Sequence, residues 1–300
     1  NIVAGLHTFA LRPIKNLNSL YLHHYTKTNS YKRYMYRIGT GVSVYGINKT
    51  NVSKLQLFCP SLHEQEKISN FFYKIDRKLG LQQERIEVLE EYKKSMMQKI
   101  FSQEIRFKDD DGKDFPEWEG KKLGEIAKNK NIRYKDDDRF DDLLSVTLNN
   151  GIKRQIDLDG TDSSSQDKSN YKVVRENDVV YNTMRMWQGA SGVSNYNGIV
   201  SSAYVVLELT KVADPKFIGY FFKTPNMIYK FFRSSQGMTS DTLTLRYNFF
   251  KEIKIELPTF LEQNKIASFL SSIDKKIQLE EERLEEMKEF KKGLMQRMFI

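Results

Sequence analysis

The sequence has little cysteine and no long apolar run, and each absence excludes a class of protein. One cysteine among 300 residues excludes a framework of intramolecular disulfides and favours a reducing compartment. No apolar run approaches the roughly 18–20 residues that a membrane-spanning helix needs, and no signal segment opens the chain. We therefore expect a cytoplasmic protein that does not cross a membrane. Cys59 precedes a proline after an apolar stretch, which favours a buried structural thiol.

Signatures of catalysis are also missing. The four histidines are His7, His23, His24 and His63, and none lies in the longest globular stretch of the chain. No glycine-rich phosphate loop follows a strand, and no Cys/His cluster has the spacing of a metal site. We therefore expect no enzyme, no cofactor and no metal ion.

Acidic residues are absent from the first 59 positions. Eight of the chain's basic residues lie there: Arg12, Lys15, Lys27, Lys32, Arg33, Arg37, Lys49 and Lys54. They account for eight of the nine net positive charges of the chain. An all-basic segment of this kind favours a polyanionic partner, most often nucleic acid. The alternative is that acidic residues outside this segment balance the charge.

One long segment occurs twice. Residues 60–101 and 258–299 align without a gap and match at 19 of 42 positions, which is the mark of a duplicated unit. Both copies have apolar residues at alternating steps of four and three, the pattern of a coiled-coil seam, and both interrupt it with Gln82/Glu280 and Lys93/Lys291. The predicted seam residues are Ile75, Leu79, Ile86, Leu89, Met96 and Ile100 in the first copy, and Ile273, Ile277, Leu284, Met287, Leu294 and Met298 in the second. We predict two long helices that pair antiparallel; two amphipathic helices packed on separate cores are the alternative.

The rest of the chain predicts an α+β fold with a largely antiparallel sheet. Short strands are expected at 142–148, 171–184, 199–209 and 249–258, helices broken at Thr224-Pro225 within 214–235, and a polar loop at 159–170. The predicted domains are the C-terminal remnant of a first domain (1–59), a helix (60–101), a complete second domain with an acidic linker (102–257, linker 102–120) and a second helix (258–300). The opening stretch NIVAGLHTF resembles the middle of a buried strand, so we expect the first domain to be incomplete.

Three loops of the second domain carry side chains of the kinds that read DNA, so we expect them to form a DNA-binding surface. Arginine, asparagine and glutamine form bidentate contacts with base edges, while serine, threonine and lysine hold phosphates. A polar surface loop is the alternative for any one of these residues. The candidates are Lys128, Lys130, Arg133 and Lys135; Asn182, Thr183, Arg185, Gln188 and Ser191; Arg233, Ser235, Gln236, Thr239, Ser240 and Arg246; and, in the first domain, Thr40 and Ser43.

The chain resembles the specificity subunit of type I restriction–modification systems. The resemblance rests on the repeated EQ.KI..F...ID.K and ER.E...E..K...MQ..F segments, and on FPEWEGKKLGEI and NTMRMWQGASGVSN. It implies two target-recognition domains, each reading one half of a bipartite site in double-stranded DNA, separated by two helices that act as a spacer. It also implies docking of two adenine-methyltransferase subunits and of a restriction and translocation subunit. A coiled-coil interaction adaptor without DNA specificity is the alternative from another class.

Overall fold

The structure is a computed structural model that describes residues 9, 12–13, 15–41, 46–135, 142–148, 151–158 and 167–299. It divides into two compact units, unit 1 (Asn1–Glu90 with Lys275–Ile300) and unit 2 (Glu91–Asp274). Each unit contains part of two long helices, α4 (Leu62–Phe101) and α9 (Phe260–Met298). The two long helices that the repeated segments predict are therefore present.

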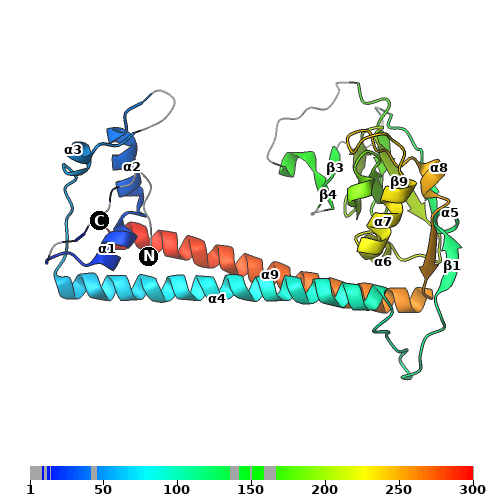
Figure 1. The fold of residues 1–300 in the computed structure, drawn as a ribbon, viewed down its shortest axis with the longest axis horizontal. Helices are drawn as coiled ribbons and strands as arrows, with labels where there is room; N and C mark the ends of the chain where they lie inside the picture. Colours follow the sequence, from blue (N-terminus) through cyan, green and yellow to red (C-terminus); the bar gives the residue numbers. More distant parts are fainter. Residues whose placement is uncertain are drawn as a thin grey trace. The chain divides into compact units, whose positions relative to one another are not determined.

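In the described part of unit 1, three short helices precede α4: α1 (Ser19–Tyr25), α2 (Asn29–Ile38) and α3 (Lys49–Val52). The side chains of Asn18, Thr28 and Asn48 cap their N-termini by accepting backbone N–H bonds, which satisfies amides that have no partner within the helix. Figure 1 shows α1 against the long helices, where Tyr21, Ile68, Phe72, Met295 and Phe299 form one buried cluster. Burial of these side chains therefore joins α1, α4 and the C-terminal end of the chain.

The described residues of unit 2 contain ten short strands in four antiparallel sheets, so the predicted largely antiparallel fold is confirmed. The central sheet has the order β2-β9-β6-β7, and the two-stranded sheets are β1-β10, β3-β4 and β5-β8. The strands are β1 (Glu119–Lys122), β2 (Ala127–Asn129), β3 (Leu144–Val146), β4 (Ile152–Arg154), β5 (Lys172–Val174), β6 (Val179–Asn182), β7 (Ser191–Val193), β8 (Gly198–Val200), β9 (Tyr204–Leu209) and β10 (Lys254–Leu257).

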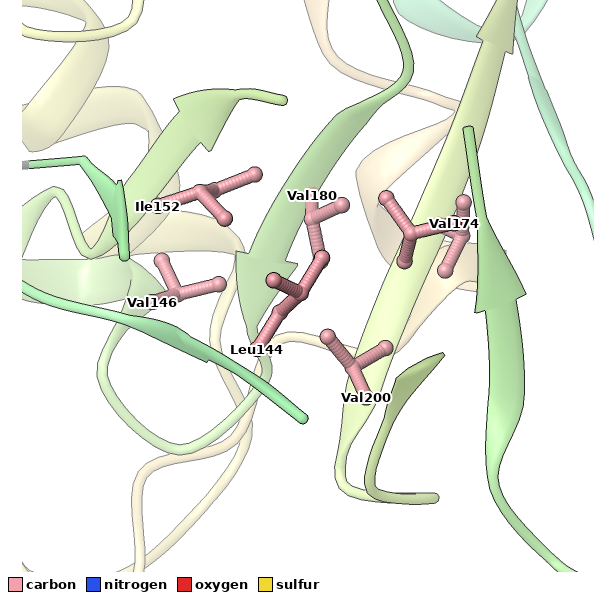
Figure 2. Close-up of a cluster of buried hydrophobic side chains, with 7 residues drawn as sticks. Leu144, Val146, Ile152, Val174, Val180 and Val200 are labelled. Atoms are coloured by element: carbon pink, nitrogen blue, oxygen red, sulfur yellow. The ribbon is translucent and has the colours of Figure 1, made fainter. Parts of the chain in front are cut away.

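One apolar cluster holds the β3-β4 and β5-β8 sheets against the central sheet. Figure 2 shows Leu144, Val146, Ile152, Val174, Val180 and Val200 converging from β3, β4, β5, β6 and β8. Branched side chains of this kind are stiff and pack well on a pleated surface. Packing of these side chains therefore fixes the β3-β4 and β5-β8 sheets on the central sheet, with which they share no strand pairing in the described residues.

Short helices lie between the strands of unit 2. They are α5 (Leu123–Ile126), α6 (Pro215–Phe221), α7 (Pro225–Ser234) and α8 (Tyr247–Phe250), with 3₁₀ turns η1 (Gln155–Asp157) and η2 (Met186–Gln188). Asp214 and Thr224 cap α6 and α7, each of which begins with proline, so the predicted break at Thr224-Pro225 is confirmed. The strand predicted over 249–258 is wrong in its first half, because Tyr247–Phe250 forms a helical turn and only Lys254–Leu257 pairs with β1.

The duplicated segment makes the same buried contact in both units. In unit 2, Gln263 donates to the carbonyls of Val212 and Pro258, at 2.9 and 2.8 Å, and accepts from the N–H of Asp214 at 2.9 Å. In unit 1, Gln65 donates to the carbonyls of Asn16 and Pro60 and accepts from the N–H of Asn18. Asn18 and Asp214 cap α1 and α6 respectively. The glutamine of the repeated EQ.KI motif therefore ties α4 to the start of α1 and α9 to the start of α6.

The polar interruptions of the seam are paired across the two long helices. In unit 1, Lys291 lies within ion-pair distance of Asp76, and Gln82 donates to the buried carboxylate of Glu280 at 2.8 Å. In unit 2, Lys93 lies 2.5 Å from Asp274. Position 76 meets 291 while 82 meets 280, so the helices run antiparallel, as predicted. The predicted seam residues are buried or half-buried except Met298, which is exposed while Met295 and Phe299 are buried in its place.

Candidate nucleic-acid interface

The loop between β6 and β7 presents an exposed arginine on a rigid frame. Asn182 accepts an N–H bond from Met184 through its side chain, and Arg185 and Ala190 close the turn through backbone bonds. Gly189 has a φ of 88°, a left-handed conformation that glycine adopts without strain. The indole of the half-buried Trp187 donates to the carbonyl of Met184 at 3.1 Å. The frame therefore fixes the backbone, while the Arg185 side chain extends into solvent.

A second polar loop lies directly beside the first. The Leu245 N–H donates to the Thr183 carbonyl at 2.8 Å, and Gln236 pairs with Thr244 through two backbone bonds. Between them, Gly237 has a φ of 153° and Met238 is fully exposed at the tip. The neighbouring side chains of Thr239, Ser240, Arg233 and Arg246 are exposed. The structure thus brings two of the three predicted loops together.

A pair of cations lies near the start of β9, beside the loop between β6 and β7. Arg133 forms an isolated bridge with Lys172, and the Lys172 ammonium donates to the carbonyl of Tyr204 at 2.5 Å. Tyr204 is opposite Asn182 in the pairing of β6 with β9. Burial, and then the charge of Arg133, lower the pKa of Lys172. Neither cation has a carboxylate partner in the described part of unit 2, so both are suited to a phosphate.

Sequence reasoning missed Lys172 and Lys223. Lys172 lies inside a strand, where a lysine fits the alternating pattern and does not indicate a binding site. Lys223 donates to the carbonyls of Leu148 and Gly189, at 2.8 and 2.7 Å, and burial lowers its pKa to about 8. Lys223 lies one residue before the cap of α7, and nothing in the sequence there indicates that its ammonium binds the carbonyl of Gly189 in the loop between β6 and β7.

Several predicted residues have structural contacts instead. Lys130 forms a buried ion pair with Asp178 at 2.7 Å, and the Ser191 hydroxyl is buried and donates to Gly189. Ser235 donates to the carbonyl of Phe231. Lys128 is opposite Glu208, which is four residues along β9 from Tyr204. Lys128 therefore lies away from the two polar loops and the cations Arg133 and Lys172.

The remaining predicted residues lie in several separate parts of the chain. Gln188 is half-buried at the end of η2, and Lys135 is exposed beyond Arg133. In unit 1, Thr40 pairs with Gly46, and Ser43 lies outside the described residues. Cys59 is exposed, so the prediction of a buried thiol is wrong; no strand covers residues 55–60.

Histidine 24 occupies the place that Tyr220 has in unit 2. Tyr220 donates to Asp274 at 2.5 Å, while the ring of His24 lies 3.9 Å from Asp76. His24 is buried against Phe72, and this burial lowers its pKa to about 4. It is therefore a neutral packing residue near pH 7.

A metal-binding cluster and a membrane-spanning helix are both absent from the described residues. They contain no group of three or more His, Cys, Asp or Glu side chains that could hold a metal ion. Within that same part of the chain, no helix is both long and apolar enough to cross a membrane.

Comparisons with known proteins agree with this architecture. The family "Type I restriction modification DNA specificity domain" matches residues 2–91 and 116–289. A curated protein of Methanocaldococcus jannaschii, named as the MjaX specificity subunit of a type I restriction enzyme, is 25% identical over 98% of this chain and 70% of its own length.

Two solved structures show the same fold. The S subunit of a type I restriction–modification system from M. genitalium matches with a TM-score of 0.57 at 16% identity, covering 95% of this chain and 73% of that one. A chain from a study of complex assembly and conformational transition in a type I system also matches with a TM-score of 0.57 at 16% identity, over 93% of this chain and 70% of that one. The family match covers most of the sequence, so the chain belongs to the family of type I restriction–modification DNA specificity domains.

Proposed function

We propose that this protein is a DNA-recognition subunit that reads one half of a bipartite site with the domain at 102–257. The observation that carries the proposal is the bond between Leu245 and Thr183, which joins two loops with exposed arginines. Arg185 and Arg246 are free to reach base edges, where bidentate contacts distinguish one base pair from another. The cationic pair Arg133 and Lys172 would hold a phosphate and fix the register.

The protein would choose the site and leave the chemistry to partners. Residues 102–257 have no net charge, with 24 basic and 24 acidic side chains. Such a domain lacks the excess of positive charge that drives strong non-specific binding. Two adenine-methyltransferase subunits and a restriction and translocation subunit would supply the remaining phosphate contacts and the reactions.

The long helices would serve as the spacer and as part of the docking surface for the methyltransferases. Leu81 and Val88 on α4, and Leu279 and Phe290 on α9, are large apolar side chains exposed on the faces that do not form the seam. Where such side chains form a contiguous patch, they mark a protein interaction site. The first recognition domain, to which we assign residues 1–59, would read the other half-site.

The test is the set of methylated adenines in cells that contain the protein and its methyltransferase. Arg185→Ala should relax or weaken recognition in one half of a two-part motif and leave the other half unchanged, because each domain reads its own half. Arg175→Ala is the matched control, since Arg175 is exposed in the turn before β6, at the end of that strand opposite Asn182. Methylation that changes equally in both halves, or not at all, would favour the coiled-coil adaptor.

A further inference from the structure

Hydrogen bonds fasten the loop between β6 and β7 to the rest of unit 2 at both of its ends. At the first end, the Thr183 hydroxyl donates to the carbonyl of Ala203, and its carbonyl accepts from the N–H of Leu245, both at 2.8 Å. At the second end, Lys223 donates to the carbonyl of Gly189 at 2.7 Å. Among the described residues, this last contact is the one hydrogen bond that ties 184–190 to a part of the chain outside 182–191.

Apolar packing at the second end holds the loop close to α7 but does not fix its direction. A Cβ at Gly189 would lie 3.1 Å from the Cδ1 of Ile228, and the rings of Trp187 and Phe232 lie 6.3 Å apart. Contacts of this kind are non-directional, whereas a hydrogen bond weakens steeply when it is bent. The Lys223 ammonium therefore supplies the directional contact.

The same ammonium joins the loop to the turn that follows β3. Lys223 donates to the carbonyl of Leu148 at 2.8 Å as well as to Gly189. The start of β7 also lies against this turn, because a Cβ at Gly192 would meet the Cα of Gly151 at 2.9 Å. Lys223 thus lies where three segments of unit 2 meet, and it binds a carbonyl group of two of them.

The charge of Lys223 is costly at this position. Burial lowers its pKa from 10.5 to about 8, so the folded protein holds this proton less tightly than the unfolded chain does. In the part of unit 2 that the structure describes, no carboxylate forms an ion pair with it. Because a buried charge without a counter-ion opposes folding, a gain in stability does not account for the lysine, whereas the bond to the loop does.

We propose that Lys223 is a positioning residue for DNA recognition, whose ammonium fixes residues 184–190 so that Arg185 meets its base edge in one geometry. This role rests on the proposed function, because Arg185 reads a base only if the domain binds DNA. A bidentate contact distinguishes bases when the guanidinium is held in register. Without the bond to Gly189, the loop samples more conformations, and Arg185 accepts more than one base.

The first test measures the order of the loop without DNA. Trp118→Phe leaves Trp187 as the only tryptophan, and quenching of its fluorescence by acrylamide reports access to the loop. Lys223→Met keeps the length of the side chain and removes the ammonium, and it should raise the quenching constant about twofold or more, because local opening exposes the indole. Lys230→Met is the matched control, since Lys230 donates to the carbonyl of Lys254 at 2.8 Å, and it should leave the constant unchanged.

Chemical restoration of the ammonium separates its effect from that of side-chain shape. Cys59→Ser removes the one cysteine of the chain, so that Lys223→Cys offers a single thiol. Alkylation of this thiol by bromoethylamine, with loss of bromide, gives a side chain of lysine's length that ends in an ammonium. Alkylation by bromopropane gives the apolar equivalent. The first product should return the quenching constant to its original value, and the second should not.

The second test is the set of methylated adenines in cells that contain the protein and its methyltransferase. Lys223→Met should raise methylation of sites with one wrong base about tenfold, the order of discrimination that one bidentate base contact gives. The wrong bases should lie in the half that Arg185→Ala affects, and the other half should be read as before. A loss of stability alone lowers methylation at all sites together, because it reduces the amount of folded protein.

The outcomes separate this role from the proposed function. An unchanged quenching constant in Lys223→Met, rescue by both alkylation products, or recognition that is unchanged or relaxed in both halves would overturn the positioning role alone. If the unchanged protein directs methylation to no two-part motif, the proposed function fails, and the role of Lys223 in recognition fails with it.

Discussion

The buried glutamine of the repeated motif offers the sharpest test of what holds unit 2 together. Gln263 is fully buried, and its side chain makes three hydrogen bonds, to Val212, Pro258 and Asp214. Gln263→Ala leaves one N–H and two carbonyl groups without this partner at the partly buried start of α9. The substitution therefore removes the link between the start of α9 and the cap of α6.

The magnitude follows from those three groups. A buried group that loses its partner costs about 1–3 kcal/mol, and the space left by the amide can admit one water that satisfies part of the loss. With about two groups left unsatisfied, the free energy of unfolding should fall by about 3–4 kcal/mol. The matched control is Gln98→Ala, because Gln98 is exposed on α4 within the same unit, and its effect should stay within about 0.5 kcal/mol.

Urea denaturation followed by tryptophan fluorescence measures the change. The only tryptophans, Trp118 and Trp187, both belong to unit 2, so the signal reports the unit that contains Gln263. A lower midpoint with an unchanged slope would show a loss of stability rather than a change of unfolded state. A loss below about 1 kcal/mol would refute the assignment of Gln263 as the link.

Three further predictions concern other polar contacts. His24→Tyr places at this position the residue type of Tyr220. Burial lowers the pKa of His24 from 6.5 to about 4, so between these pH values the unfolded state binds more protons than the folded state. Stability therefore falls as the pH is lowered from 6.5 towards 4. The tyrosine should abolish that loss, measured as urea midpoints at pH 7 and pH 5; a persistent loss would exclude His24 as its source. Asp178→Asn should cost about 3–5 kcal/mol in tryptophan-monitored unfolding, because it strands the buried Lys130 charge, and a cost below about 1 kcal/mol would contradict this. Deleting residues 79–85 together with 277–283 keeps the seam in phase, removes Gln82 and Glu280 as a pair, and shortens each helix by about 10 Å. The gap between methylated half-sites should then change by about three base pairs. An unchanged gap would refute the spacer role of the long helices.

Local patterns in the sequence predicted most of the elements. The steps of four and three between apolar residues indicated α4 and α9, because a helix repeats its faces every 3.6 residues. Alternating runs indicated β5, β6, β8 and β9, and Thr224-Pro225 indicated the boundary of α7. These signals depend on neighbours in the chain, so a single sequence contains them.

The pairing of distant segments could not be predicted in this way. Nothing near Lys172 indicates that its ammonium reaches the carbonyl of Tyr204, and nothing near Lys130 indicates Asp178. The same limit explains Cys59, whose neighbours resemble those of Leu257 although only the latter has a strand opposite it. The candidate interface was therefore predicted as loops, while the choice of side chains within it needed the fold.

The polar interruptions of the seam explain why the repeated segments resemble each other in detail. A lysine in a coiled-coil seam is costly unless a carboxylate meets it, and Lys93 meets Asp274 while Lys291 meets Asp76. Each copy thus supplies the acid for the base of the other, so a change in one copy leaves a charge unpaired in its twin. Gln82 and Glu280 occupy equivalent positions yet meet each other, and there the two copies differ. A second carboxylate at position 82 would place like charges together, whereas an amide can donate to the one that remains.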